Sequence, residues 1–186
     1  IDPLNVFGNN TLGLRGEARN VKQALLEGRR DVDAVILGSS KLMFIDPAEF
    51  PEYRMVNASF FAALPEEMLL MAKTYAQPGR LLIIGLDFWM MNEFGWAFLD
   101  EPDIGPPTPS DYLLGWNGLR DSFGTLRAAM AGRDAEYTQD GFYQPSLTPG
   151  QQAMVLADAY NQDLRVLIPT YDHFVLSARR IAVLEA

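Results

Sequence analysis

The chain has 186 residues, 48% of them hydrophobic, which suits one globular domain with its own core. Its net charge is −9 at pH 7, which argues against nucleic acid as a partner and against nonspecific binding to an anionic membrane surface, because both depend on basic patches. The chain contains no cysteine, so disulfides, thiolate metal sites and cysteine catalysis are excluded.

The chain opens with a predicted N-terminal arm, a helix and a strand. Residues 1–20 are rich in Asn and Gly and show no clear period, so we expect an extended arm. Residues 21–30 predict a short helix whose last turn is basic. The apolar run 34–37, which stops at Gly38, predicts a buried strand of a parallel sheet.

The next segment continues the alternation of strands and helices. Two proline turns are predicted within 41–52, and 54–57 predicts a second short strand. A helix is expected to start at Pro65 and to end before Pro78. The run 81–86 predicts a third strand, and because it is apolar on both faces we expect it to be central in the sheet.

The second half is mostly helical in pattern. Residues 93–110 form a proline-rich connector, and Ser110 predicts the N-cap of a long helix. Residues 136–143 predict a turn or a small hairpin. Two further helices are expected, over 148–162 and over 170–186.

These elements predict a single α/β domain over residues 1–186, with helices on both faces of a mostly parallel sheet. The sequence contains no stretch long enough to span a membrane and no signal peptide. It starts at Ile1 rather than Met, and its last predicted helix meets no stop signal before Ala186. We therefore expect a chain truncated at its C-terminus, with room upstream for a membrane anchor.

Three short motifs lie at the carboxyl ends of the predicted strands, where open α/β sheets bind ligands. They are GSSK at 38–41, NAS at 57–59 and GLDFWMMN at 85–92. In this order and spacing the region 31–92 resembles the SGNH hydrolase-like proteins. It is similar above all to a poorly characterised bacterial branch with sequences much like ILGSSR, YNLS and GLDFFMFN.

The resemblance implies a three-layer α/β/α sandwich with a flavodoxin-like sheet and, in active relatives, a serine esterase or acyl-transfer site. Ser40 matches the nucleophile, and Ser39 stands where the family has an aspartate. Ser59 matches the glycine of the oxyanion hole, and Asp87 matches its asparagine. An ionised Asp87 would repel the developing oxyanion, so this position departs from the family pattern.

A serine nucleophile also needs an imidazole base and an acid that orients it. The family supplies these from a C-terminal Asp-x-x-His block, whereas the single histidine here, His173, directly follows Asp172. His173 is the candidate base, with a packing or surface role as the alternative. The expected block therefore lies beyond Ala186, or the site is degenerate.

Several other residues have two interpretations. Asn57 and Asn92 could assist at the oxyanion, and Asn57 could instead bridge the Ser40 turn by hydrogen bonds. Lys41 could hold a carboxylate or phosphate, or be a solvated cation. The aromatic run 88–98 could line an acyl or glycan pocket, or form core at a sheet edge. The remaining acidic pair is expected to supply helix-start charges: Glu66 and Glu67.

Two functional hypotheses follow. The first is an extracytoplasmic SGNH-type hydrolase or acetyltransferase that acts on O-acyl groups of a cell-envelope glycan, with this fragment inactive by itself. It places the protein in the periplasm or on a membrane anchor facing it, because related proteins occur in polysaccharide acetylation systems. The second is a non-catalytic SGNH-like domain that binds a glycan or a partner protein. Neither hypothesis requires a cofactor or a metal, and both leave the oligomeric state open.

Overall fold

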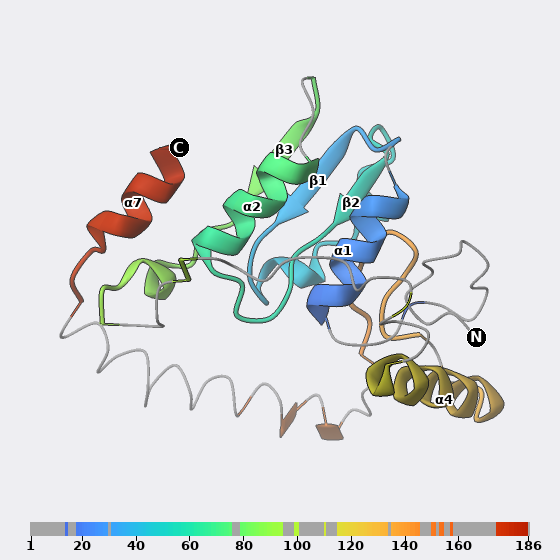
Figure 1. Cartoon of the computed structure of the whole chain (residues 1–186). Helices are drawn as coiled ribbons and strands as arrows, with labels where there is room; N and C mark the ends of the chain where they lie inside the picture. Colours follow the sequence, from blue (N-terminus) through green and yellow to red (C-terminus); the bar gives the residue numbers. More distant parts are fainter. Residues whose placement is uncertain are drawn as a thin grey trace.

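The protein is described here by a computed structural model (Figure 1). The described residues are 14, 18–29, 31–75, 79–94, 99–100, 110, 115–133, 135–145, 150–151, 153–154, 157 and 174–185. Within them the chain forms a mixed α/β fold around a three-stranded parallel sheet. The strands are β1 (Ala34–Leu37), β2 (Met55–Asn57) and β3 (Leu81–Ile84).

The sheet has the strand order β2-β1-β3, so β1 is the central strand of the described sheet. β3 pairs there only with β1, and its residues Leu81 and Ile84 are 42% and 44% exposed. The prediction that β3 is central is therefore wrong for this part of the chain. An apolar run predicts a strand, but the identity of its neighbours depends on the connections between strands.

Both helices of the first half pack on one face of the sheet. Figure 1 shows α1 (Ala18–Gly28) and α2 (Pro65–Tyr75) side by side over the strands. Val35 and Leu37 of β1 point into the core that these helices cover. α1 begins before the predicted start, so residues 18–20 are helical rather than part of an arm.

The opposite face of the sheet is covered by the connection between β1 and β2. Ala34 and Ile36 form a small core there with Leu42, Ile45 and Phe50 of that connection. It contains two 3-10 turns, η1 (Leu42–Phe44) and η2 (Pro47–Glu49). The described residues thus place helices on one face and a loop on the other, and they do not confirm a three-layer sandwich.

This topology makes β1 and β3 neighbours although they are not consecutive along the chain. The connection from β1 to β2 crosses one face, whereas α2 carries the chain from β2 to β3 across the other. The turns after β1 and β3 therefore meet at a point where the strand order reverses. Such switch points are where open α/β sheets bind their ligands.

The second half contains η3 (Phe88–Met91), α4 (Trp116–Met130) and α7 (Ala178–Glu185). The predicted N-cap at Ser110 is wrong, because Ser110 is itself helical and Gly115 is the N-cap of α4. The predicted hairpin is confirmed: Tyr137 and Tyr143 pair antiparallel across a turn in which Gly141 has a φ of 82°.

Residues 174–177 form an extended strap that leads into α7. Leu176 forms an antiparallel bridge with Asn92, and the backbone N–H of Ser177 donates to the carbonyl of Met91 at 2.8 Å. The predicted helix over 170–186 is therefore wrong at residues 174–177, because their backbone forms hydrogen bonds with residues 91–93 instead of helical ones. α7 follows directly and packs against α2, at the left of the molecule in Figure 1.

Several predictions fall mainly outside the described residues. Only Leu14 and residues 18–20 are described within the predicted arm, and only 93, 94, 99, 100 and 110 within the connector. In the predicted helix 148–162 the five described residues are helical: Gly150, Gln151, Ala153, Met154 and Ala157. Among the described helices, none has the length and apolar character needed to cross a bilayer.

Candidate functional site

The turns after β1 and β3 both pack against Leu42. A Cβ placed on Gly38 would lie 2.9 Å from Leu42 Cδ2, and one on Gly85 would lie 2.4 Å from both Cδ atoms. A side chain at either glycine position would displace Leu42. The two glycines therefore let Leu42 hold the turn that carries residues 39–41 against the end of β3.

That arrangement brings the first and third motifs together. The hydroxyl of Ser39 donates a hydrogen bond to Oδ2 of Asp87, and both side chains are buried. Lys41 Nζ lies 3.1 Å from Oδ1 of the same carboxylate, while two thirds of the lysine side chain is exposed. The carboxylate of Asp87 is thus held from inside by a serine and from the solvent side by a cation. Lys41 thus pairs with a carboxylate of the protein itself and remains largely exposed to solvent, so its role toward a ligand stays a prediction.

Ser40 lies between these residues in sequence and has a different environment. It is half-buried, and its hydroxyl makes no hydrogen bond to a residue that the structure describes. Within that part of the chain, the hydroxyl of Ser39 holds the turn through Asp87, whereas the hydroxyl of Ser40 makes no such bond. This is the distribution expected if Ser40 meets a ligand.

Asn57 bridges the Ser40 turn to the end of β2. Its buried side-chain amide donates to the carbonyls of Leu42 and Ile45 at 2.7 and 2.8 Å, and its Oδ1 accepts from the backbone N–H of Ser59. The bridging role considered for Asn57 is therefore observed. Because the N–H of Ser59 is already engaged, it is not free to donate to an oxyanion in this conformation.

Ser59 itself is fully buried next to this bridge. Its Oγ has no hydrogen-bond partner among the described residues. A buried hydroxyl without a partner costs free energy, so Ser59 is a destabilising feature at the end of β2.

Asn92 holds the C-terminal strap. Its Oδ1 accepts from the backbone N–H groups of Phe94 and Val175 at 3.3 and 3.2 Å, and its carbonyl accepts from Arg180 at 3.1 Å. These contacts give Asn92 a structural role at the junction of η3 and α7.

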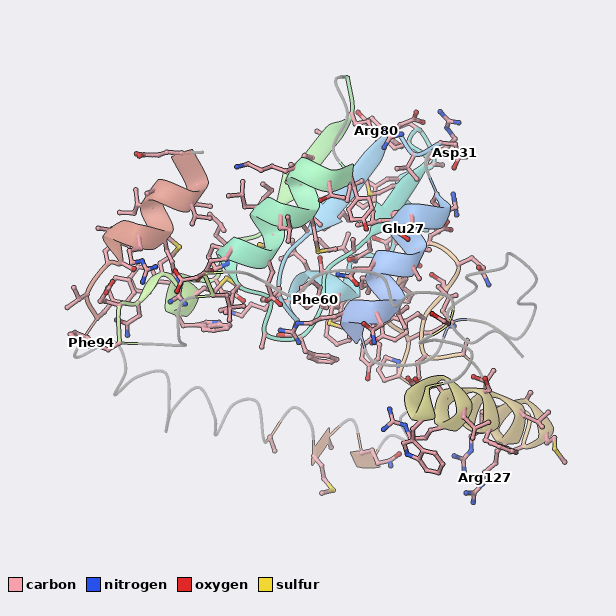
Figure 2. The ribbon with its side chains drawn as sticks, viewed as in Figure 1. Glu27, Asp31, Phe60, Arg80, Phe94 and Arg127 are labelled. Carbon is pink, nitrogen blue, oxygen red and sulfur yellow. The ribbon has the colours of Figure 1, made fainter. Side chains whose placement is uncertain are left out.

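The aromatic run is divided between surface and core. Phe88 is exposed and stacks on Phe174 of the strap, with ring centroids 3.9 Å apart. Met90 and Met91 are buried, whereas Phe94 is 72% exposed and lies at the periphery in Figure 2. Residues 95–98 lie outside the described part of the chain.

No known protein family, curated protein or solved structure matches this chain. The SGNH resemblance therefore rests on the three motifs alone. Two of them contact each other directly through Ser39 and Asp87, and Asn57 joins the second motif to the turn of the first.

The base of a serine site is not found among the described residues. The candidate His173 lies outside them, one position before Phe174. The described residues also contain no cluster of three or more acidic or histidine side chains suited to a metal ion. What they provide at one end of the sheet is a half-buried serine hydroxyl, a buried carboxylate and an exposed lysine.

Sequence analysis missed Lys22, which is fully buried behind the site. Its Nζ donates to the carbonyls of Asn57, at 2.8 Å, and Gly141, and lies 5.0 Å from the ring centre of Tyr137. Burial lowers the pKa of Lys22 to about 7. A signal was present in the sequence, because Lys22 is spaced three and four residues from Leu25 and Leu26 on the apolar face of α1.

Sequence analysis also underestimated the two glutamates at the start of α2. Glu67 does cap the helix, accepting from the N–H of Leu64 at 2.8 Å, but it also pairs with Arg19 at 2.7 Å. Glu66 is buried and faces the buried Arg180 of α7 at 3.4 Å. Both carboxylates thus tie α2 to segments distant in sequence.

Proposed function

We propose that this chain is an SGNH-like domain with a serine site for acyl groups of a cell-envelope glycan, and that Ser40 is the residue that meets the acyl group. The observation that carries the proposal is the division of labour between the two serines. Ser39 is tied to Asp87, while Ser40, at the switch point of the sheet, has a hydroxyl without a described partner.

In this proposal the Ser40 hydroxyl attacks an ester carbonyl while a base takes its proton. The ester C–O bond then breaks, the sugar hydroxyl leaves with that proton, and an acyl-enzyme remains. The acyl group then passes to water in an esterase or to a sugar hydroxyl in a transferase. His173, one residue before the strap that stacks on Phe88, is the candidate base in this chain.

A second candidate, a non-catalytic glycan-binding or protein-binding domain, is favoured by one specific observation. The carboxylate of Asp87 is buried, and the SGNH resemblance assigns an oxyanion donor to this position, where a negative charge would oppose the charge that develops during acyl transfer. Asn57 and the N–H of Ser59 are meanwhile occupied by the fold.

The deciding experiment is labelling with a fluorophosphonate probe, applied to residues 1–186 and to the full-length protein as its natural gene encodes it. Each is compared with Ser40→Ala and with the neighbouring control Ser39→Ala. The proposal expects labelling of the full-length protein that Ser40→Ala abolishes and Ser39→Ala retains. It also expects residues 1–186 to hydrolyse p-nitrophenyl acetate no faster than their Ser40→Ala variant.

Absence of labelling in both proteins would reject the acyl-transfer proposal and favour the binding domain. That candidate is then tested by calorimetric titration with glycan fragments prepared from a bacterial cell envelope, acetylated and deacetylated. Failure of both titrations would reject binding of these glycans and leave a partner protein.

A further inference from the structure

α4 presents an unusual distribution of side chains. The residues that it turns toward the rest of the protein are small, namely Gly118, Thr125 and Ala128, all buried. Its large apolar residues are all exposed: Trp116 (75%), Leu119 (48%), Phe123 (65%), Leu126 (41%) and Met130 (82%). An ordinary surface helix does the opposite, burying its apolar stripe against the core.

The exposed residues form one continuous stripe. They are spaced three and four residues apart, which places them on a single face along the whole 15-residue helix. Figure 1 shows α4 at the periphery of the molecule, and in Figure 2 the side chain of Arg127 points away from the sheet. A stripe of this kind marks a surface made for an apolar partner.

The charges beside the stripe are basic although the protein is acidic. Arg120 and Arg127 are exposed on one flank, and Arg133 is exposed just after the helix. The single acidic side chain of residues 116–133, Asp121, is mostly buried and pairs with Arg120 at 3.2 Å. This segment carries a net charge of +2, so the rest of the chain carries −11.

We propose that α4 is a membrane-surface helix that lies in the headgroup region of an anionic lipid bilayer. Helices that bind in this way place Trp, Phe and Leu on the apolar side and arginines beside them, as α4 does. Trp116 at its first turn suits the interface, where tryptophan is enriched. The acidic remainder of the protein opposes this only weakly, since physiological salt screens charges beyond about 8 Å.

A second copy of the chain fits this surface less well. Two antiparallel α4 helices would place Arg120 of one copy near Arg127 of the other, a repulsive pair. The one acidic side chain of α4, Asp121, is mostly buried and already paired with Arg120, so none is exposed to face an arginine of a second copy. The arginine flank therefore favours an anionic occupant over self-association.

The experiment is flotation of residues 1–186 with vesicles of pure phosphatidylcholine and with vesicles of equal parts phosphatidylcholine and phosphatidylglycerol. We expect binding to the anionic vesicles only, weakened by added salt. The double variant Phe123→Ser with Met130→Ser should lose it. The double variant Arg120→Gln with Arg127→Gln should bind about 30-fold more weakly, because each arginine near an anionic surface contributes about 1 kcal/mol.

Matched controls make the result specific to α4. Phe44→Ser removes another exposed phenylalanine, and Arg54→Gln with Arg179→Gln removes two exposed arginines elsewhere. Both should bind like the unaltered protein, and far-ultraviolet circular dichroism checks that every variant is folded.

Three outcomes would overturn the proposal. They are absence of flotation with anionic vesicles, equal binding to neutral vesicles, and a dimer in multi-angle light scattering that Phe123→Ser with Met130→Ser converts to a monomer. The last outcome would assign the stripe to self-association.

Discussion

Lys22 illustrates how one residue joins several parts of the site region. Its amine reaches the carbonyl of Asn57 at the end of β2 and that of Gly141 in the hairpin turn. None of the described residues that it contacts is a carboxylate. The positive charge of Lys22 is therefore stabilised only by carbonyl dipoles and by the ring of Tyr137. This is the physical reason that its pKa is lowered.

The lowered pKa predicts a stability that rises with pH. Between a folded pKa of about 7 and an unfolded value of 10.5, the unfolded chain binds a proton at Lys22 that the folded chain does not. The free energy of unfolding should therefore increase by about 1.4 kcal/mol per pH unit in this window relative to Lys22→Met. Urea titrations of both proteins from pH 7.5 to 10 measure the difference. Parallel pH profiles would contradict a lowered pKa.

The charge of Asp87 bears directly on the acyl transfer proposed for Ser40. If Ser40 acts as a nucleophile, Asp87→Asn replaces a repelling charge with an amide that can donate to the oxyanion. We expect the rate of fluorophosphonate labelling of Ser40 to rise by about tenfold, given that one oxyanion donor is worth at least that much. The control is Asp100→Asn, at an exposed aspartate outside the site. A slower rate in Asp87→Asn would mean that the charge positions the turn through Ser39 and Lys41.

At the scale of elements, Leu42 connects the turn after β1 to the turn after β3. It fills the space over Gly38 and Gly85, and its carbonyl accepts from Asn57. The geometry of the serine turn thus depends on a leucine and two glycines rather than on the serines themselves.

This packing predicts opposite effects at two glycines. Gly85→Ala places a Cβ 2.4 Å from Leu42, so overpacking should cost about 1–3 kcal/mol of unfolding free energy. Gly124→Ala, in α4, meets nothing within 4 Å and should stabilise by up to about 1 kcal/mol. Thermal unfolding of both variants tests this, and Leu42→Ala should recover part of the loss in Gly85→Ala. A Gly85→Ala protein as stable as the unaltered one would show that Leu42 can move freely.

α7 is attached to the fold by polar contacts as much as by packing. Arg180 is fully buried, faces Glu66 of α2 and donates to the carbonyl of Asn92, while Ser177 pairs with Met91. A single side chain, Arg180, therefore joins α7 both to α2 and to the end of η3.

Removing the guanidinium of Arg180 should release α7. Arg180→Met leaves the buried carboxylate of Glu66 unpaired, at a cost of about 3–5 kcal/mol. Hydrogen exchange should increase over 178–185 and over η3. The neighbouring variant Arg179→Met breaks an exposed pair with Asp100 and should cost less than about 1 kcal/mol. Equal exchange in the two variants would show that Arg180 does not hold the strap.

At the scale of the whole molecule, the strands of the sheet differ in how deeply they are buried. Every residue of β1 is buried, whereas no residue of β3 is. We therefore expect substitutions in β1 to destabilise the protein more than substitutions in β3.

Two isoleucines on the neighbouring strands β1 and β3 test this asymmetry. Ile36→Thr buries a hydroxyl in β1 and should cost about 2–4 kcal/mol, while Ile84→Thr in β3 should cost less than about 1 kcal/mol. Chemical denaturation gives both values. Equal costs would mean that β3 is buried in solution, as its apolar sequence predicted.

Local patterns determined most elements of the first half of this protein. The apolar runs that stop at glycine predicted β1 and β3, Pro65 predicted the start of α2, and Asp140-Gly141 predicted the hairpin turn. The three motifs were also predicted to lie at the carboxyl ends of the strands, which is where Ser39 of the first contacts Asp87 of the third. These features depend on backbone preferences and on periods within a few residues, which a sequence displays directly.

Only the tertiary structure decided what covers each surface. It placed β3 at the edge of the described sheet, buried Lys22 and Glu66, assigned Ser39 rather than Ser40 to Asp87, and turned the large residues of α4 outward. The period of a helix or strand identifies an apolar face, but it carries no information about which distant segment meets that face. That choice depends on contacts between residues far apart in the chain, and it is these contacts that distinguish a core from an exposed binding surface.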